Sequence, residues 1–332
     1  TGRSSKPSAR AIAEPGEVSP FSRSGPGIGP TSNKAIKPEV VEYGGNLVVN
    51  DAGLLEPENP GVSVVSTAME QSGRLFRAGS GTSFSTPRVA RLAADILGAY
   101  PNASANLLRC LIAISARVPE PASRQFANLD EVRRAVGYGR PAEYLALQSG
   151  GSRAVLLFQG DMTVDTAVVH PIPVPESFAR GQWQRRVRVA VAFDPPVRRE
   201  RREYVAATLR VDLVRNTDPV ELQAIYEAQD PDERHELFND RRRVALKPGS
   251  QAMSASTLQV RTWSQKRLDI DDGDTYYLVL SHRRQTWART LPAYGTERYA
   301  VAIELDAEGQ PSLDTFALLE QRLQPEVRLR LR

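Results

Sequence analysis

The spacing of apolar residues changes near residue 150, and the pattern before that point predicts short strands followed by helices. Apolar side chains three and four positions apart line one face of a helix, and the helices expected on this basis are 87–100, 104–117, 129–136 and 142–148. Short β-branched runs bounded by Gly and Pro predict strands at 39–43, 46–49 and 62–68. Strands followed by long helices indicate an α/β domain.

Beyond residue 150, apolar and polar positions alternate instead. Val187, Val189, Val191 and Phe193 recur at every second position, which places them on one face of a strand. The strands expected in this half are 154–158, 186–193, 204–214, 258–263, 275–281 and 299–305, with one helical interruption at 219–228. Several short alternating strands separated by turns predict an antiparallel all-β sandwich.

A Ser-Gly-Gly-Ser break at 149–152 separates the two patterns. A chain of 332 residues is long for one ordinary domain and long enough for two, each with its own core. We therefore expect an α/β domain over residues 1–149 and a β-sandwich domain over residues 150–332.

Composition removes several classes of function. No run of about 18 apolar residues is present to span a bilayer, so no membrane role is expected. The net charge of +4 comes from arginine clusters, but acids such as Glu200, Glu203 and Asp240 interrupt them and no zinc spacing accompanies them, so no nucleic-acid partner is expected. The single cysteine, Cys110, lies in an apolar helical pattern and should be a buried thiol.

Chemistry is concentrated in residues 79–90, which read Gly-Ser-Gly-Thr-Ser-Phe-Ser-Thr-Pro-Arg-Val-Ala. Glycines there allow a tight backbone approach, and Ser83 then stands just before an expected helix. Unpaired N–H groups and the positive end of the helix dipole would stabilise an oxyanion formed beside that serine. Ser83 is therefore the candidate nucleophile, with a capping role for Ser83 and Ser85 as the alternative.

This motif resembles the nucleophile motif of the subtilisin-like serine peptidases, Gly-Thr-Ser-x-(Ala/Ser)-(Ser/Thr)-Pro-His-Val-Ala. Ser83 matches the nucleophile, and Gly81 and Thr82 match the turn that faces the substrate. Arg88 replaces the His that usually follows the Pro. That His is not a member of the catalytic triad. Three further matches to the family keep its order along the chain, namely 21–26 (Phe-Ser-x-x-Gly-Pro), 36–41 (Lys-Pro-Glu-Val) and 136–139 (Gly-Tyr-Gly), so that the resemblance covers about residues 8–148.

The resemblance implies a serine endopeptidase with part of a subtilisin-like parallel sheet, a polypeptide substrate and no cofactor. The family places its Asp, its His and an oxyanion-hole Asn before the nucleophile, and we expect these in the missing N-terminal part of the same peptidase domain. His170, His235 and His282 all follow residue 150, and none is expected to serve as the base. The resemblance to a bacterial branch further suggests a companion ATPase. We expect the chain alone to be inactive.

A non-enzymatic role is the rival interpretation: a catalytically inactive subtilase that acts as an interaction or binding module through its β-sandwich. The opening residues TGRSSKPSAR carry neither an apolar signal region nor an initiator Met, so the chain is expected to be a piece of something longer. The cytoplasm is favoured as its location, and secretion stays open because the N-terminus is absent. The acidic run 269–274 is interpreted as a β-turn rather than a calcium site, because no distal bidentate Glu follows it. Trp183, Trp263 and Trp287 are expected to pack in the core rather than form a ligand platform.

Overall fold

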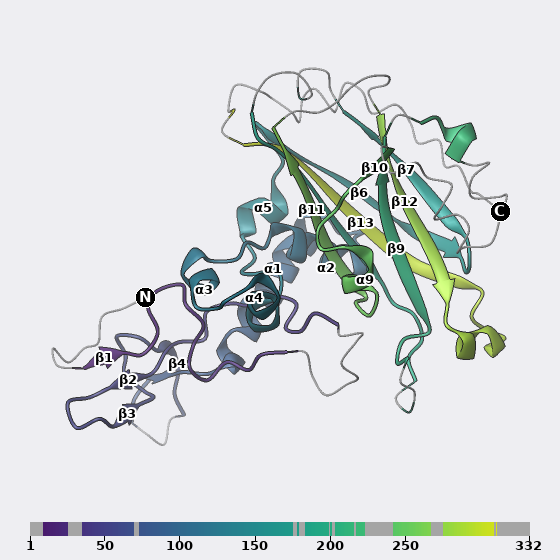
Figure 1. Cartoon of the computed structure of the whole chain (residues 1–332). Coiled ribbons are helices and arrows are strands. Elements are labelled where there is room, and N and C mark those ends of the chain that lie inside the picture. Colours follow the sequence, from purple (N-terminus) through teal and green to yellow (C-terminus); the bar gives the residue numbers. More distant parts are fainter. Residues whose placement is uncertain are drawn as a thin grey trace. The chain divides into compact units, whose positions relative to one another are not determined.

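The structure is a computed structural model and describes residues 9–25, 35–69, 73–174, 178, 183–198, 200, 203–215, 217–222, 242–266, 275–308 and 310 (Figure 1). The chain divides into two compact units. The first consists of Thr1–Ile28, Ile36–Asn102 and Ser115–Ala146, and the second of Gly29–Ala35, Ala103–Ile114 and Leu147–Arg332. His235, the acidic run 269–274, the carboxyl-terminal arginines and most of the expected helix 219–228 lie outside the described residues.

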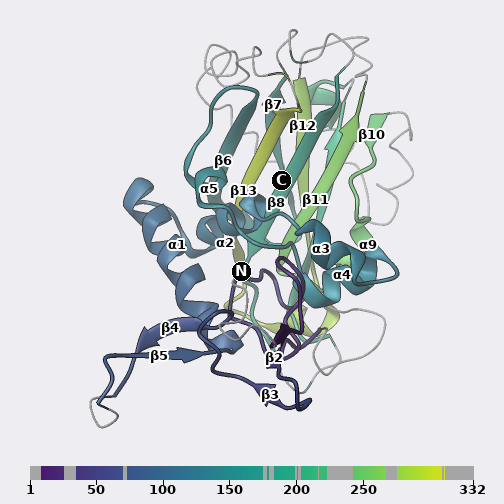
Figure 2. The same cartoon turned by 90° about the vertical axis from the view of Figure 1, so that its left-hand side faces the viewer.

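The first unit mixes short strands with helices. One sheet joins β1 (Arg10–Ala11), β2 (Val48–Val49) and β3 (Leu55–Glu56), and a second joins β4 (Val64–Thr67) to β5 (Phe76–Gly79). The helices are η2 (Thr82–Phe84), α1 (Thr86–Ala99), α3 (Glu120–Arg124), α4 (Leu129–Val136) and α5 (Glu143–Leu147). Figure 2 shows α1 above the β4–β5 hairpin. Helices and sheets together give the mixed α/β class that the sequence predicts.

The parallel sheet expected for this part of the chain is wrong for the residues that the structure describes, where every strand pair is antiparallel. A parallel pair needs a crossover of a dozen or more residues, whereas β4 and β5 are joined by a short connection that favours a hairpin. Residues 39–43 also form no strand. Their backbone is bonded instead to the segment after α4, through Tyr138 N–H to Glu39 O (2.8 Å) and Val41 N–H to Gly139 O (3.0 Å).

Apolar spacing located the helices well. Helix α4 has the bounds predicted for it, and its buried Val132, Ala135 and Val136 pack with Ala122 of α3. Asn128 caps α4, because its side chain accepts hydrogen bonds from the N–H groups of two residues in the first turn. Helix α3 was not predicted from the sequence.

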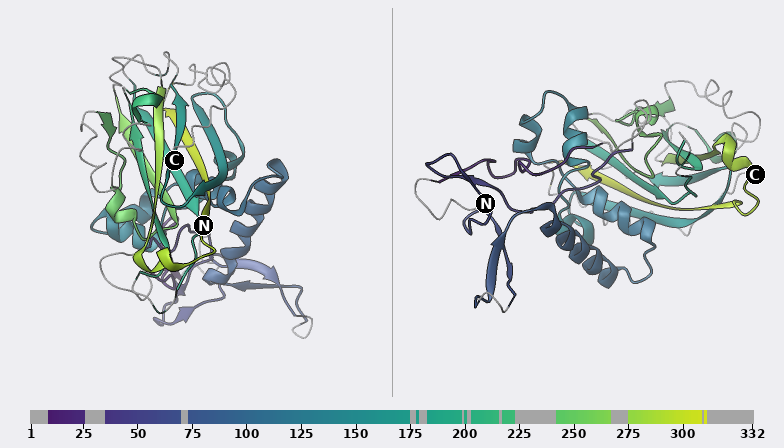
Figure 3. Two further views of the ribbon diagram at one scale, coloured as in Figure 1. Left: turned by 90° about the vertical axis from the view of Figure 1, so that its right-hand side faces the viewer. Right: turned by 90° about the horizontal axis from the view of Figure 1, so that it is seen from below.

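The second unit contains two antiparallel sheets (Figure 3). Each has four strands, in the orders β11-β8-β13-β6 and β10-β9-β12-β7. The strands are β6 (Arg153–Thr163), β7 (Ala167–Pro173), β8 (Arg185–Phe193), β9 (Ala207–Val214), β10 (Arg243–Val244), β11 (Leu258–Gln265), β12 (Thr275–Arg284) and β13 (Thr296–Ala307), with the short helices α9 (Ser250–Met253) and η4 (Thr286–Thr290). Both sheets contribute to one hydrophobic cluster, in which Val189 and Ile303 from one sheet join Val211 and Leu278 from the other. Every second side chain of β8, β9 and β13 faces this cluster, so each of these strands has one apolar side toward it.

Helix α2 (Ala105–Ser115) belongs to the second unit although it lies within the α/β half of the sequence. The side-chain amide of Asn106 donates to Asp194 Oδ1 (2.9 Å) and Arg298 O (3.2 Å), and the Arg188 guanidinium donates to Ile114 O (2.9 Å). Cys110 Sγ donates to Ala300 O (3.4 Å).

The strands beneath α2 carry small side chains. Ala190 and Ala192 of β8 and Ala300 and Ala302 of β13 are fully buried, and they alternate with the larger residues that face the apolar cluster. Small side chains let a helix approach a sheet closely, which accounts for the contact between the Cys110 thiol and the strand backbone. Cys110 is fully buried, as its apolar helical pattern predicts.

The boundary expected between residues 149 and 150 remains a prediction. The contacts divide the chain near Leu147 but also assign α2 to the second unit. Among the described residues, no helix is both long and apolar enough to cross a membrane.

Candidate active site

The candidate nucleophile Ser83 lies in a turn between strand β5 and helix α1. The chain leaves β5 at Gly79, passes Gly81 in an extended conformation (φ 162°, ψ 157°), and forms the one-turn helix η2 over Thr82–Phe84. Pro87 occupies the first turn of α1, where a missing N–H costs no hydrogen bond. Helix α1 is 14 residues long and begins directly after this turn, so its amino-terminal end lies next to the turn.

The Ser83 side chain is exposed, and its hydroxyl has no hydrogen-bond partner in the part of the chain that the structure describes. Its backbone N–H is equally unpaired there, whereas the N–H groups of Phe84 and Ser85 bond to Gly81 O (3.1 Å) and Thr82 O (3.0 Å). The free hydroxyl is placed to attack a carbonyl. The adjacent unpaired N–H, near a helix amino terminus, is placed to stabilise the oxyanion that forms.

The capping alternative does not hold for Ser85. Ser85 is the residue before α1, but its side chain makes no capping bond to the helix. Its hydroxyl donates instead to Glu42 O at 2.8 Å, 43 residues earlier in the chain.

Three hydrogen bonds attach the nucleophile turn, residues 80–85, to residues 42–46, which we call the anchor segment. Besides the Ser85 bond, Gly81 N–H donates to Gly44 O (2.8 Å) and Ser80 Oγ donates to Asn46 O (2.8 Å). A Cβ atom on Gly44 would lie 2.5 Å from Gly81 O and 2.8 Å from Ser85 Oγ, so only glycine allows this approach. The anchor segment is not predicted from the sequence, where the adjacent glycines 44 and 45 are the signal that could have revealed it.

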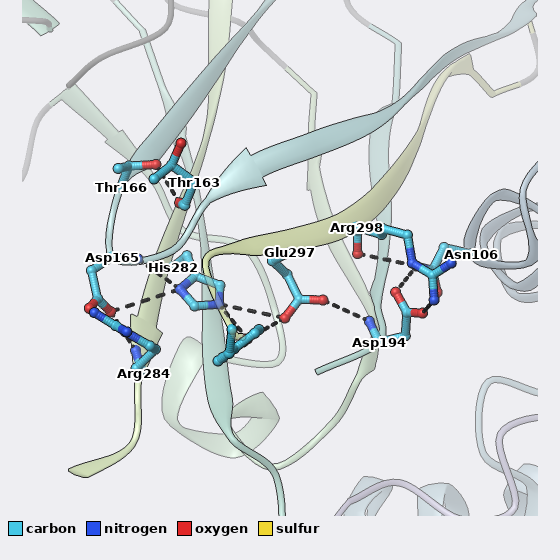
Figure 4. A network of polar contacts seen from close by, with 10 residues as sticks. Asn106, Thr163, Asp165, Thr166, Asp194, His282, Arg284, Glu297 and Arg298 are labelled. Carbon is cyan, nitrogen blue, oxygen red and sulfur yellow. Dashed lines mark hydrogen bonds and ion pairs between the residues drawn. The ribbon is translucent and has the colours of Figure 1, made fainter. Parts of the chain in front are cut away.

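His282 is buried in the second unit and engaged on both sides of its ring (Figure 4). Asp165 N–H donates to Nδ1 (3.0 Å), so the ring proton lies on Nε2, which is 2.9 Å from the Tyr294 hydroxyl. Tyr294 in turn donates to the carboxylate of Glu297, which is also buried. Burial and the Glu297 carboxylate raise the pKa of the Tyr294 hydroxyl, which keeps its proton for this hydrogen bond.

His170 is also buried, with Nε2 3.2 Å from the Tyr299 hydroxyl and its ring against Phe158. Both described histidines thus have structural partners inside the second unit. The sequence contains no His before residue 170, so the first unit contains no histidine that could act as a base for Ser83.

Other residues singled out from the sequence have simpler roles. The Arg88 side chain is exposed on α1. Trp287 is buried, and Trp183 and Trp263 pack partly buried against the main apolar cluster, as predicted. Within the described ranges there is no group of three or more His, Cys, Asp or Glu side chains that could hold a metal ion.

A serine on such a turn at the start of a helix fits the geometry of a serine hydrolase, and comparison with known proteins specifies the family. The model of the subtilase family of peptidases matches residues 8–139. The uncharacterised protein y4bN of Sinorhizobium fredii (strain NBRC 101917 / NGR234) is 35% identical over 324 residues, which cover 95% of this chain and 72% of that protein. The chain belongs to the subtilase family. Serine peptidase activity is the general kind of function that this family implies.

Proposed function

We propose that this chain carries the nucleophile of a subtilisin-type serine endopeptidase that hydrolyses peptide bonds in polypeptide substrates. The observation that carries the proposal is the exposed, unbonded hydroxyl of Ser83 beside its own unpaired N–H at the start of α1. Ser83 Oγ attacks the scissile carbonyl, the Ser83 N–H contributes to the oxyanion hole, and Gly81 and Thr82 shape the turn that faces the substrate.

The base must come from elsewhere, because a serine hydroxyl without one is a weak nucleophile. We propose that the N-terminal part of the same peptidase domain supplies the Asp, the His and an Asn donor, and so completes the site around Ser83. The burial and bonding of His170 and His282 support this assignment. A companion ATPase remains a further proposal that rests on the resemblance alone.

For the second unit we propose a β-sandwich that serves as an accessory domain. The cluster shared by its two antiparallel sheets supports this architecture. If the site were never completed, the chain would be an inactive subtilase that acts as an interaction module through this domain.

Labelling with a fluorophosphonate probe tests the proposal and separates the two functions. The peptidase with its upstream sequence should be labelled, and Ser83→Ala should abolish labelling. Ser66→Ala is the matched control, because Ser66 is exposed on β4 outside the nucleophile turn. No labelling of the folded, completed protein would refute the peptidase proposal and favour the interaction module.

A further inference from the structure

The anchor segment that holds the nucleophile turn is itself fixed by a distant arginine. Arg140 Nε donates to Glu42 Oε1 at 2.9 Å, and the Arg140 guanidinium lies over the Tyr43 ring, 4.2 Å from its centroid. The Glu42 side chain is only 11% exposed, and the same Oε1 also accepts from Tyr43 N–H (2.9 Å). One guanidinium thus holds the first two residues of the anchor segment.

Arg140 is well placed to act as a fixed point, because its own backbone is bonded on both sides. Its N–H donates to Arg117 O and its carbonyl accepts from Arg117 N–H, both at 2.9 Å. The preceding Gly139 has φ +100°, and a Cβ there would lie 2.3 Å from the Arg117 backbone. Glycine is therefore required for the close approach of these two segments.

We propose that Arg140 and Ser85 are positioning residues for the nucleophile. Arg140 fixes Glu42, the Glu42 carbonyl receives the Ser85 hydroxyl, and Ser85 holds η2 so that the Ser83 hydroxyl keeps its orientation. The catalytic role of Arg140 and Ser85 rests on the proposed function of Ser83. The bonds by which they hold the nucleophile turn are a property of this chain alone. Positioning of this kind raises the rate of a reaction because it removes unproductive orientations of the attacking group.

Native-state hydrogen exchange in the 332-residue chain tests the hold on the turn. Glu42→Ala, Arg140→Gln and Ser85→Ala should each speed exchange at the Gly81 and Ser85 amides by about tenfold. Exchange at the buried Ile96 of α1 should stay unchanged. Glu42→Gln should restore slow exchange, because its amide oxygen still accepts from Arg140. Arg133→Gln is the control, since it removes an ion pair with Asp130 (2.9 Å) in α4 that does not contact the turn.

Equal acceleration at Ile96 and at the turn would overturn the proposal, because it would indicate only global destabilisation. The catalytic part is tested in the peptidase with its upstream sequence, where Arg140→Gln should lower kcat about tenfold with KM within about twofold. Glu42→Gln should keep kcat near that of the unmodified enzyme. An unchanged kcat in Arg140→Gln would refute the positioning role. If the unmodified enzyme is not labelled at Ser83, the proposed function fails, and the exchange data then decide the hold on the turn by themselves.

Discussion

At the scale of single residues, Arg88 departs from the family motif and is expected to have no chemical role. Its side chain is exposed on α1, and it takes no part in the three hydrogen bonds that hold the nucleophile turn. In the peptidase with its upstream sequence, Arg88→His should leave turnover within about threefold, which corresponds to about 0.7 kcal/mol in the barrier. Steady-state kinetics on a peptide substrate measures this. A hundredfold loss would show that the position acts on the reacting atoms.

Cys110 should make stability depend on alkaline pH. Burial raises the pKa of its thiol from the ordinary value of 9.0 to about 12, so the folded state keeps a proton that the unfolded state loses above pH 9. The stabilisation is thus complete below pH 9 and is lost as the pH rises toward 12. Between pH 8 and 10.5, the loss should be about 2 kcal/mol.

Urea unfolding of the unmodified chain and of Cys110→Ala at the two pH values isolates this effect. As the pH rises from 8 to 10.5, the free energy of unfolding of the unmodified chain should fall by about 2 kcal/mol relative to that of Cys110→Ala. A difference that is independent of pH would mean that the thiol is not buried in solution.

Prediction at the residue level relied on chemistry that is local in the sequence. Ser83 is the predicted nucleophile because the glycines, the serine and the helix start are contiguous. Glu42 and Arg140 were not found, since 41 residues separate Glu42 from Ser83 and 57 separate Arg140 from it, and an ion pair leaves no periodic signal. Whether Ser83 acts as the nucleophile remains a prediction.

At the scale of elements, the cap of α4 offers a clean measurement. Asn128 Oδ1 accepts from the N–H groups of Asp130 (3.1 Å) and Glu131 (3.0 Å) at an exposed position. Asn128→Ala leaves both groups without this partner and should lower the free energy of unfolding by about 1 kcal/mol. Asn128→Asp keeps the acceptor and should cost much less, as measured by urea titration. Equal losses in both variants would contradict the capping role.

Elements with strong periodicity were predicted well, and short irregular ones were not. The strands of the second unit were located because their alternation is long, although most extend one to five residues beyond the prediction. Strand β7 was missed because it contains Pro171 and Pro173, and an edge strand tolerates prolines that a central strand does not. The sequence predicts a strand at 39–43, but the backbone there bonds to single residues after α4 rather than to a neighbouring strand.

At the scale of the whole molecule, the 332-residue chain taken alone should be catalytically inert. It should neither cleave casein nor be labelled by a fluorophosphonate, and Ser83→Ala should change neither result, because loss of the base costs nearly as much as loss of the whole triad. Addition of the upstream region should produce labelling that depends on Ser83. Strong labelling of the isolated chain would show that a base comes from His170, His235, His282 or a partner chain.

Limited proteolysis should locate the boundary between the domains. Gln148, Gly150 and Gly151 are exposed, and Gly151 adopts φ 58° in a turn that separates two different sequence patterns. A protease of broad specificity such as proteinase K should cut first within 148–153, as mass spectrometry of the fragments would show. First cuts within 186–193 or 204–214 would mean that the domains are drawn wrongly.

The placement of α2 limits how such proteins can exchange their modules by gene fusion. A recombination junction near residue 150, where the amino-acid pattern changes, would separate the all-β strands from the helix that covers Ala190, Ala192, Ala300 and Ala302. A chimera built that way would expose an alanine surface and leave the Asp194 carboxylate without its bond from Asn106. A working chimera would have to keep residues 103–114 together with the β-strands, although these residues lie within the part of the chain that the subtilase family model matches. The two halves of this gene are therefore expected to be inherited together rather than shuffled apart.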